Sequence, residues 1–145
     1  MPIFPRFSAI REAQNLLLQH FGATPLIKSK TLGSAGAQVY LKNETVLPTG
    51  SFKPRGALFA LASNLKRRRI EEVIACSTGN HGAAVAFAAK SLGVPAIIFL
   101  PEHPVPVKRK KIEQLGARIV DTGSPDLAGA FQHANEYASA PASIS

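Results

Sequence analysis

Three short apolar runs dominate the second half of the sequence. They are Val73–Cys76, Ala96–Leu100 and Ala117–Val120, and each is followed by a stretch with helical spacing. Apolar runs of this length without polar alternation are typical of strands buried on both faces of a sheet. Gly93 and Gly116 are expected to end the first two helices at matching places in the repeat. The pattern predicts an α/β fold in three layers, with βα units forming a parallel sheet between helices.

The N-terminal part has a less regular pattern. Residues 8–21 are expected to form an amphipathic helix that stops at Gly22, and Gln38–Lys42 is expected to be a strand. The side chains expected to face inward on that helix are Ile10, Leu17, Leu18 and Phe21. Lys53–Lys66 is a further helix that is apolar on several sides, and a helix of that kind should be buried.

Two more helices follow from capping signals and apolar spacing. One is expected to start with Ser124 as its N-cap and Pro125 as its first residue, and to reach Tyr137. The other begins near the basic cluster Lys108–Lys111. Its apolar face is expected to consist of Val107, Ile112 and Leu115.

One lysine stands where a strand gives way to a helix. Pro48 and Gly50 predict a turn, after which Ser51 is a suitable N-cap. Pro54 is tolerated in the first helical turn because its missing N–H has no helical partner there. The positive end of the helix dipole disfavours an ammonium at Lys53 and favours the neutral amine, which can condense with an aldehyde or accept a proton. Lys53 is therefore the candidate catalytic residue.

A polar loop follows the first of the buried strands. It reads Ser77-Thr78-Gly79-Asn80-His81-Gly82 and lies where a strand ends and a helix begins, so that free backbone N–H groups converge on an anion. Ligands of parallel sheets bind beyond the carboxyl ends of the strands. The loop is thus a candidate site for a carboxylate.

Taken together, these segments resemble the pyridoxal-phosphate enzymes of fold type II, the tryptophan synthase β superfamily. The match runs in order from Glu44 to Ala57, and Thr24-Pro25-Leu26 is similar to a shorter signature of the same family. The threonine/serine dehydratase branch is the most similar one. The resemblance covers about residues 5–137. Leu47 and Ala83 depart from the usual pattern, which has glutamine at or near these positions.

The resemblance implies a cofactor, pyridoxal 5′-phosphate, and a role for each site residue. Lys53 would bind the cofactor as its Schiff-base lysine and act as the base, and Phe52 would pack near the ring. Asn80 would contact the 3′ oxygen of the cofactor. The substrate's carboxylate would be bound by Ser77, Thr78, Gly79, Asn80 and His81. The implied reaction is dehydration of L-threonine or L-serine to a 2-oxo acid and ammonia.

The resemblance also implies a domain organisation. Residues 1–67 would be the N-terminal part of a large domain, and residues 68–145 would form a small βα domain of the fold type II kind. The family then returns to complete the large domain, and no counterpart of that second half occurs here. The glycine run that holds the cofactor's phosphate is also missing, because the sequence contains no Gly-Gly pair. We therefore expect an N-terminal fragment that is inactive alone, and a homo-oligomer when full length.

Composition and charge add limits on partners and location. The net charge of +8 comes mainly from Lys66–Arg69 and Lys108–Lys111, and neither cluster has interleaved aromatic residues that could stack on bases. We expect both to be solvated, with no nucleic-acid partner. No apolar run approaches the roughly 20 residues that span a bilayer, so no membrane association is expected. The four histidines show no metal-ligand spacing. The single cysteine, Cys76, is expected to be buried in a protein of the reducing cytoplasm.

Three functional hypotheses remain at this stage. The first is the dehydratase, favoured by Asn80-His81-Gly82 in the loop. The second is another fold type II reaction, either that of serine racemase, which uses a serine hydroxyl at the position of Thr78, or that of threonine synthase. The third is a non-catalytic fragment that binds partners through its positive charge.

Overall fold

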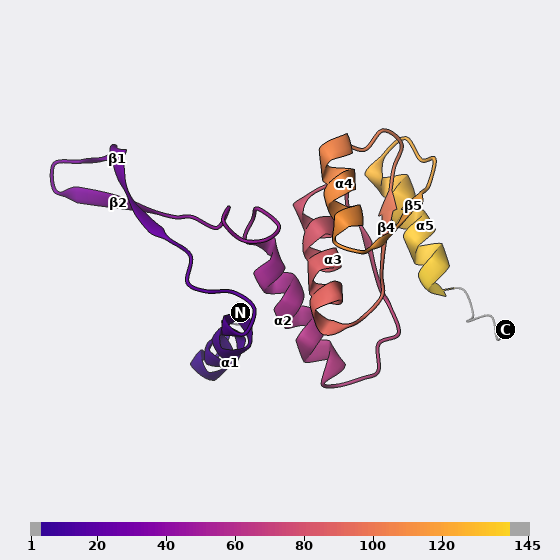
Figure 1. Cartoon of the computed structure of the whole chain (residues 1–145), viewed down its shortest axis with the longest axis horizontal. Helices are drawn as coiled ribbons and strands as arrows, with labels where there is room; N and C mark the ends of the chain where they lie inside the picture. The colour runs from indigo at the N-terminus through magenta and orange to yellow at the C-terminus, as the bar shows by residue number, and fades with distance from the viewer. Residues whose placement is uncertain (1–3, 140–145) are drawn as a thin grey trace. The chain divides into compact units, whose positions relative to one another are not determined.

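The structure of the chain is a computed structural model that describes residues 4–139. It divides into two compact units, residues 1–52 and residues 53–145. The elements of the first unit are α1 (Phe7–Leu18), β1 (Leu26–Ser34) and β2 (Ala37–Lys42). Those of the second unit are α2 (Lys53–Leu65), β3 (Val73–Cys76), α3 (Asn80–Leu92), β4 (Ala96–Leu100), α4 (Pro106–Gln114), β5 (Arg118–Asp121) and α5 (Leu127–Ser139) (Figure 1).

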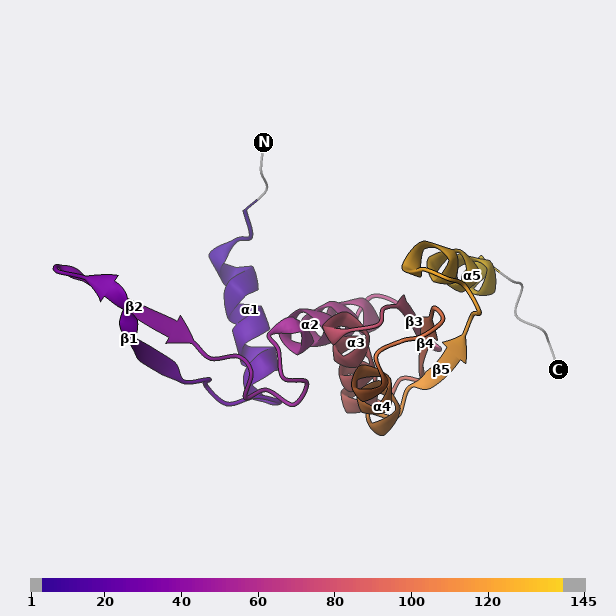
Figure 2. The same ribbon diagram turned by 90° about the horizontal axis from the view of Figure 1, so that it is seen from above.

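A three-stranded parallel sheet organises the second unit. Its strand order is β3-β4-β5, with Val73 opposite Ala96 and Ile97 opposite Arg118. Helices α3 and α4 lie against one face and α5 against the other, and α2 packs on the outer side of α3 (Figure 2). The three-layer α/β fold predicted from the apolar runs is thereby confirmed.

The core lies on both sides of β4, the central strand. All five residues of β4 are buried, which explains why its sequence is uninterrupted and apolar. On one side Ile98 and Leu100 are fully buried, as are Leu58 of α2 and Ile112 of α4. On the other side Ile97, Phe99 and Ala134 form a buried cluster with partly buried Ile74, Cys76 and Val120 around it.

Glycines end two helices as the sequence predicts. Gly93 follows α3 with φ 69°, and Gly116 lies beyond α4 with φ 84°. Both values fall in the left-handed region, which glycine adopts without a steric cost.

The start of α5 differs from the prediction. Asp126, rather than Ser124, acts as the N-cap, because its Oδ1 accepts a hydrogen bond of 2.8 Å from the N–H of Gly129. Ser124 belongs instead to the turn after β5, where its N–H donates to Thr122 Oγ1 at 3.3 Å. A carboxylate closer to the first turn therefore displaces the serine from the capping role.

Several predicted boundaries and faces also need correction. The third strand begins at Arg118 instead of Ala117. In α4, Ile112 is fully buried as predicted, but Val107 is 77% exposed because it lies in the first turn, away from the sheet. The prediction of a buried helix at α2 is confirmed for Leu58, Leu61 and Ala62.

The first unit consists of α1 and an antiparallel hairpin of β1 and β2. Helix α1 ends at Leu18, before the predicted stop at Gly22, and none of its residues is buried. Ile10 and Leu18 were expected to face inward but are 51% and 59% exposed, whereas Phe21 is buried. One helix and a two-stranded sheet offer too little apolar surface to cover these side chains.

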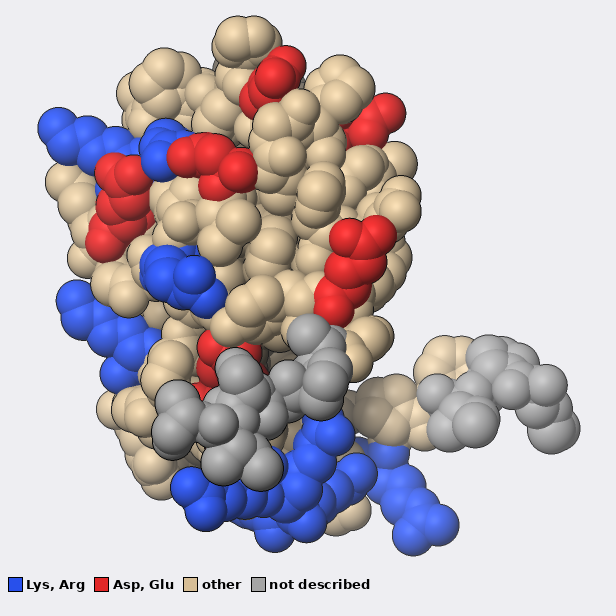
Figure 3. All heavy atoms as spheres, turned by 90° about the vertical axis from the view of Figure 1, so that its right-hand side faces the viewer, with Lys and Arg blue, Asp and Glu red and all other residues tan. Residues whose placement is uncertain are grey.

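The predicted domain boundary after residue 67 concerns the complete family pattern and stays a prediction. In this structure the compact units meet at Phe52 and Lys53, so α2 belongs with the βα units. Basic side chains lie along the left side and across the bottom of the face drawn in Figure 3. Residues 66–69 are exposed.

Between residues 4 and 139, none of the helices has the length and apolar character needed to cross a membrane.

Candidate functional site

Lys53 is the first residue of α2, where the sequence predicts it. The turn before it is closed by the N–H of Gly50, which donates to the Leu47 carbonyl at 2.7 Å, and Gly50 has φ 72°. Pro54 follows the lysine and is fully buried, which anchors the start of the helix. The side chains of Lys53 and Phe52 lie toward solvent, with Phe52 63% exposed. The sequence thus fixes the backbone around the lysine, whose side chain is exposed.

A contact in the first unit links two of the sequence signatures. The hydroxyl of Thr24 donates to Glu44 Oε1 at 2.6 Å, and the ammonium of Lys42 donates to the Thr24 carbonyl at 2.6 Å. Thr24 is buried. The threonine of Thr24-Pro25-Leu26 therefore holds the start of the Glu44–Ala57 segment in place, which is a structural reason for the two to occur together.

The Ser77–Gly82 loop joins β3 to α3 at the carboxyl end of the sheet. Ser77 is buried, and its Oγ accepts a hydrogen bond of 3.3 Å from the N–H of Gly79. Gly79 is the N-cap residue of α3, and no side chain caps this helix. Thr78 is half-buried, while Asn80 and His81 are exposed. The first-turn N–H groups and the positive end of the helix dipole are consequently open to an anion.

Gly82 allows α3 to begin close to the strand. A Cβ atom at this position would lie 2.7 Å from the carbonyl oxygen of Ser77 and 3.1 Å from Cδ1 of Ile112. The first of these separations is shorter than real side chains tolerate. The glycine is therefore required by close packing, and this packing sets the position of the loop.

Lys53 and the Ser77–Gly82 loop lie at the same end of the second unit. Helices α2 and α3 pack side by side, and Figure 1 shows that both begin at the end where the strands of the sheet finish. The candidate catalytic amine and the candidate carboxylate loop thus come from adjacent helix starts.

One residue near the loop was missed by the sequence analysis, which assigned it to a solvated basic cluster. Lys108 lies in the first turn of α4, and a Cβ atom on Gly79 would be 3.8 Å from its Nζ. Strand order places only the start of α4 near the loop, because α4 follows β4, the neighbour of β3, and the carboxyl ends of neighbouring parallel strands meet at one edge. It does not single out Lys108 among the lysines of that helix.

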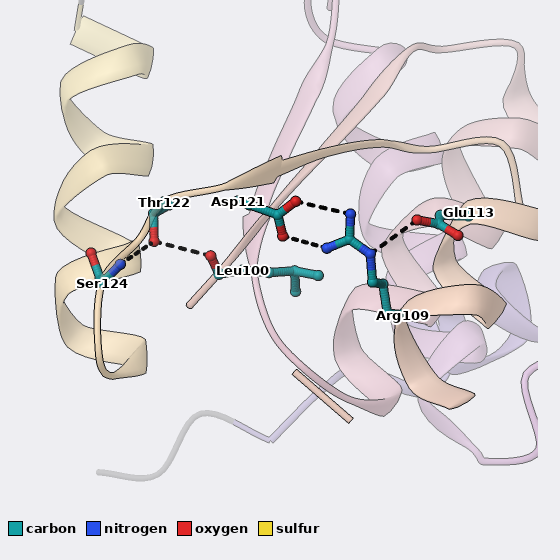
Figure 4. Close-up of polar contacts among 6 residues, drawn as sticks. All are labelled: Leu100, Arg109, Glu113, Asp121, Thr122 and Ser124. Carbon is teal, nitrogen blue, oxygen red and sulfur yellow. Dashed lines mark hydrogen bonds and ion pairs between the residues drawn. The ribbon is translucent and has the colours of Figure 1, made fainter. Parts of the chain in front are cut away.

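The residue after Lys108 fixes the position of α4. The guanidinium of Arg109 donates to both carboxylate oxygens of Asp121 at the end of β5, and its Nε donates to Glu113 Oε1 at 3.1 Å (Figure 4). The hydrogen bond to Asp121 is the main reason that the pKa of Arg109 is raised. Beside this pair, Thr122 Oγ1 donates to the Leu100 carbonyl at 3.0 Å and joins the ends of β4 and β5.

Two other features adjoin the Ser77–Gly82 loop. An open groove of about 370 Å³ is bordered by α2, α3 and β3, with Leu61, Val73, His81 and Val85 among its lining residues, and it includes neither Lys53 nor Asn80. Cys76 is half-buried, and burial raises the pKa of its thiol. Over the described part of the chain, no three His, Cys, Asp or Glu side chains come together as metal ligands would.

Comparison with known proteins gives a consistent result. Residues 17–144 match the family model described as "Pyridoxal-phosphate dependent enzyme". The chain is 37% identical over 119 residues to an L-threo-3-hydroxyaspartate ammonia-lyase of Saccharomyces cerevisiae, which covers 81% of the chain and 36% of that protein. It is 39% identical over 116 residues to an L-threonine ammonia-lyase of Thermotoga maritima, which covers 79% of the chain and 29% of that protein.

Solved structures show the same likeness. The crystal structure of a pyridoxal 5′-phosphate-dependent aspartate racemase superposes with a TM-score of 0.85 at 34% identity, over 95% of this chain and 44% of that one. The chain therefore spans less than half the length of each of these three proteins.

Proposed function

The chain belongs to the family of pyridoxal-phosphate-dependent enzymes, and from this premise we propose that its full-length form converts L-threonine or L-serine to a 2-oxo acid and ammonia. The water lost in the elimination is consumed again in the hydrolysis of the enamine. The observation that carries the proposal is that Lys53 and the Ser77–Gly82 loop both begin helices at one end of the second unit. Similarity to ammonia-lyases acting on threonine and on 3-hydroxyaspartate supports the lyase class.

The residues present fit part of the cofactor. The exposed side chain of Lys53 carries a primary amine that would condense with the aldehyde, and the exposed Asn80 amide would donate to the ring's 3′ oxygen. When bound, pyridoxal 5′-phosphate accepts the electrons of the substrate's Cα–H bond. Donors for its phosphate are not supplied by a glycine run in these 145 residues. We therefore propose that the chain alone binds the cofactor weakly and is inactive.

The chain's own residues then have distinct tasks. The hydroxyls of Ser77 and Thr78 and the amides at the start of α3 bind the substrate's carboxylate and fix its orientation. Lys53 Nζ takes the proton from Cα, as the base of the reaction. The β-hydroxyl leaves with a proton as water, and hydrolysis of the released enamine gives the 2-oxo acid and ammonia.

Racemisation is the second candidate function, because an aspartate racemase is among the similar structures. It needs an acid–base group on the opposite side of Cα from Lys53, and the half-buried Thr78 carries a hydroxyl in the position that the family resemblance assigns to this group. A threonine adds a methyl group beside that hydroxyl, which disfavours close approach to Cα. The threonine synthase reaction and a non-catalytic role through positive charge rank below both.

The proposed function is tested with the purified full-length protein and pyridoxal phosphate. We expect 2-oxo acid from L-threonine or L-serine, to be compared with L-threo-3-hydroxyaspartate and with isomerisation of serine and aspartate. Lys53→Ala should abolish the activity. Isomerisation without 2-oxo acid would favour the racemase, and no turnover of any amino acid would contradict the proposal.

We further propose that the full-length protein is a cytoplasmic homo-oligomer. Residues 1–67 would belong to its large domain and residues 68–145 to its small domain.

A further inference from the structure

Lys108 brings a positive charge to the loop that receives the proposed carboxylate. It is the third residue of α4, a helix whose start lies beside the start of α3 at the carboxyl end of the sheet. Gly79 is the N-cap residue of α3, and a Cβ atom built on it would lie 3.8 Å from Lys108 Nζ. Apart from the residues next to Gly79, no other heavy atom comes within 4 Å of that Cβ position. The ammonium thus lies close to the backbone of the loop at Gly79.

The structure holds this lysine in place without neutralising it. Arg109, the next residue, ties the first turn of α4 to Asp121 and Glu113. Among residues 4–139, no carboxylate forms an ion pair with Lys108. The nearby acidic side chain of Asp121 is already engaged by Arg109. The charge of Lys108 therefore remains available to a ligand.

The loop's other donors are neutral hydroxyls, an amide side chain and backbone N–H groups. A carboxylate bound by these groups alone keeps an uncompensated negative charge, and a hydrogen bond to a charged donor is stronger than one to a neutral donor. We propose that Lys108 is a further binding residue for the carboxylate at the Ser77–Gly82 loop. This inference rests on the proposed function only in identifying that carboxylate as the substrate's.

The exposure of the Lys108 side chain determines how much it can contribute to carboxylate binding. Lys108 is an exposed side chain, so its contribution should resemble that of a surface ion pair rather than a buried one. Removing its charge should therefore weaken carboxylate binding about two- to five-fold. The effect should shrink as salt is added, because exposed charges are screened.

Lys110 offers a matched control. It lies two residues further along α4, is exposed, and carries the same charge. Lys108→Met and Lys110→Met lower the net charge equally, so a difference between them reports position rather than overall charge. Lys108→Arg keeps the charge and should keep most of the affinity. Lys108→Gln serves as a second neutral variant if the methionine variant folds poorly by circular dichroism.

The test is a titration of the 145-residue chain with sodium acetate at constant ionic strength, followed through the amide resonances of residues 79–82. We expect saturable shifts at these amides, weakened about two- to five-fold in Lys108→Met and unchanged in Lys110→Met. Equal affinity in all variants would overturn the role of Lys108 while leaving the loop and the proposed function intact. An absence of saturable shifts in the unmodified chain would overturn both the role of Lys108 and the assignment of the loop as a carboxylate site. If the full-length protein instead shows no amino-acid turnover, the proposed function fails, but acetate binding at the loop is not affected.

Discussion

Arg109 holds Asp121 through a two-pronged ion pair that joins α4 to the end of β5, with Nη2 2.9 Å from Oδ2 (Figure 4). This pair sets the position of the first turn of α4 relative to the carboxyl edge of the sheet. Lys108 lies in that turn, so the pair has a consequence for the candidate site as well as for stability.

Asp121→Asn should lower the free energy of unfolding by up to about 1 kcal/mol, the upper range for exposed pairs, because the geometry is bidentate. Glu113→Gln removes only the contact to Nε within the same helix and should cost about 0.3–0.5 kcal/mol. Urea unfolding of both variants measures the two costs. An equal cost for both would show that the link to β5 adds nothing beyond the contact within the helix.

Gly82→Ala should destabilise the protein by about 1–3 kcal/mol, the usual cost of overpacking, since its Cβ would meet the Ser77 carbonyl oxygen at 2.7 Å. Gly56→Ala is the matched control, because Gly56 lies inside α2 with open space around its Cβ position. That substitution should be neutral or stabilising by up to about 1 kcal/mol. Thermal or urea unfolding measures both changes. Equal changes in the free energy of unfolding for the two variants would contradict the role of close packing at Gly82.

Cys76 should make stability depend on alkaline pH. Burial raises the pKa of its thiol above the ordinary value for cysteine, so the folded protein holds the thiol proton more tightly than the unfolded chain does. This contribution is complete below the unfolded pKa and declines as pH rises through the folded pKa. The unfolding free energy under reducing conditions should therefore fall more between pH 8 and pH 10 in the parent chain than in Cys76→Ala. If the unfolding free energy falls equally with pH in both proteins, the Cys76 thiol does not contribute to the pH dependence.

Asn80→Ala should weaken cofactor and substrate binding in the full-length protein more than it changes stability. The reason is that Asn80 is exposed at the start of α3 and no hydrogen bond of its side chain supports the fold within the described residues. Spectral titration with pyridoxal phosphate, together with urea unfolding, separates the two effects. Unchanged binding and turnover would count against the proposed role of Asn80.

Local sequence rules predicted much of the second unit. The apolar run of β4 and the glycines after α3 and α4 carry their structural signal in a few neighbouring residues, and all three appear where expected. Exposure in the first unit could not be predicted this way. Leu18 has an inward position in a helical pattern, but whether an apolar face is covered depends on what packs on it, and no local pattern contains that information.

For the candidate site, the sequence predicts some of the residues and not others. Lys53 follows a turn predicted from Pro48 and Gly50, and the Ser77–Gly82 loop follows an apolar strand, so both could be found from the sequence and both stand at helix starts. The predicted N-cap was wrong, because α2 begins at Lys53 and Ser51 lies one residue before the N-cap position. Lys108 could not be separated from the neighbouring lysines, because its proximity to Gly79 arises only when two βα units are placed side by side.

The central claim is that Lys53 is the residue that binds the cofactor. The most direct measurement is borohydride reduction of the full-length protein loaded with pyridoxal phosphate, followed by peptide mapping of the labelled lysine. We predict that the label is found on Lys53 and that no single lysine is labelled in the Lys53→Ala variant. A label on a different lysine, with Lys53 unmodified, would contradict it.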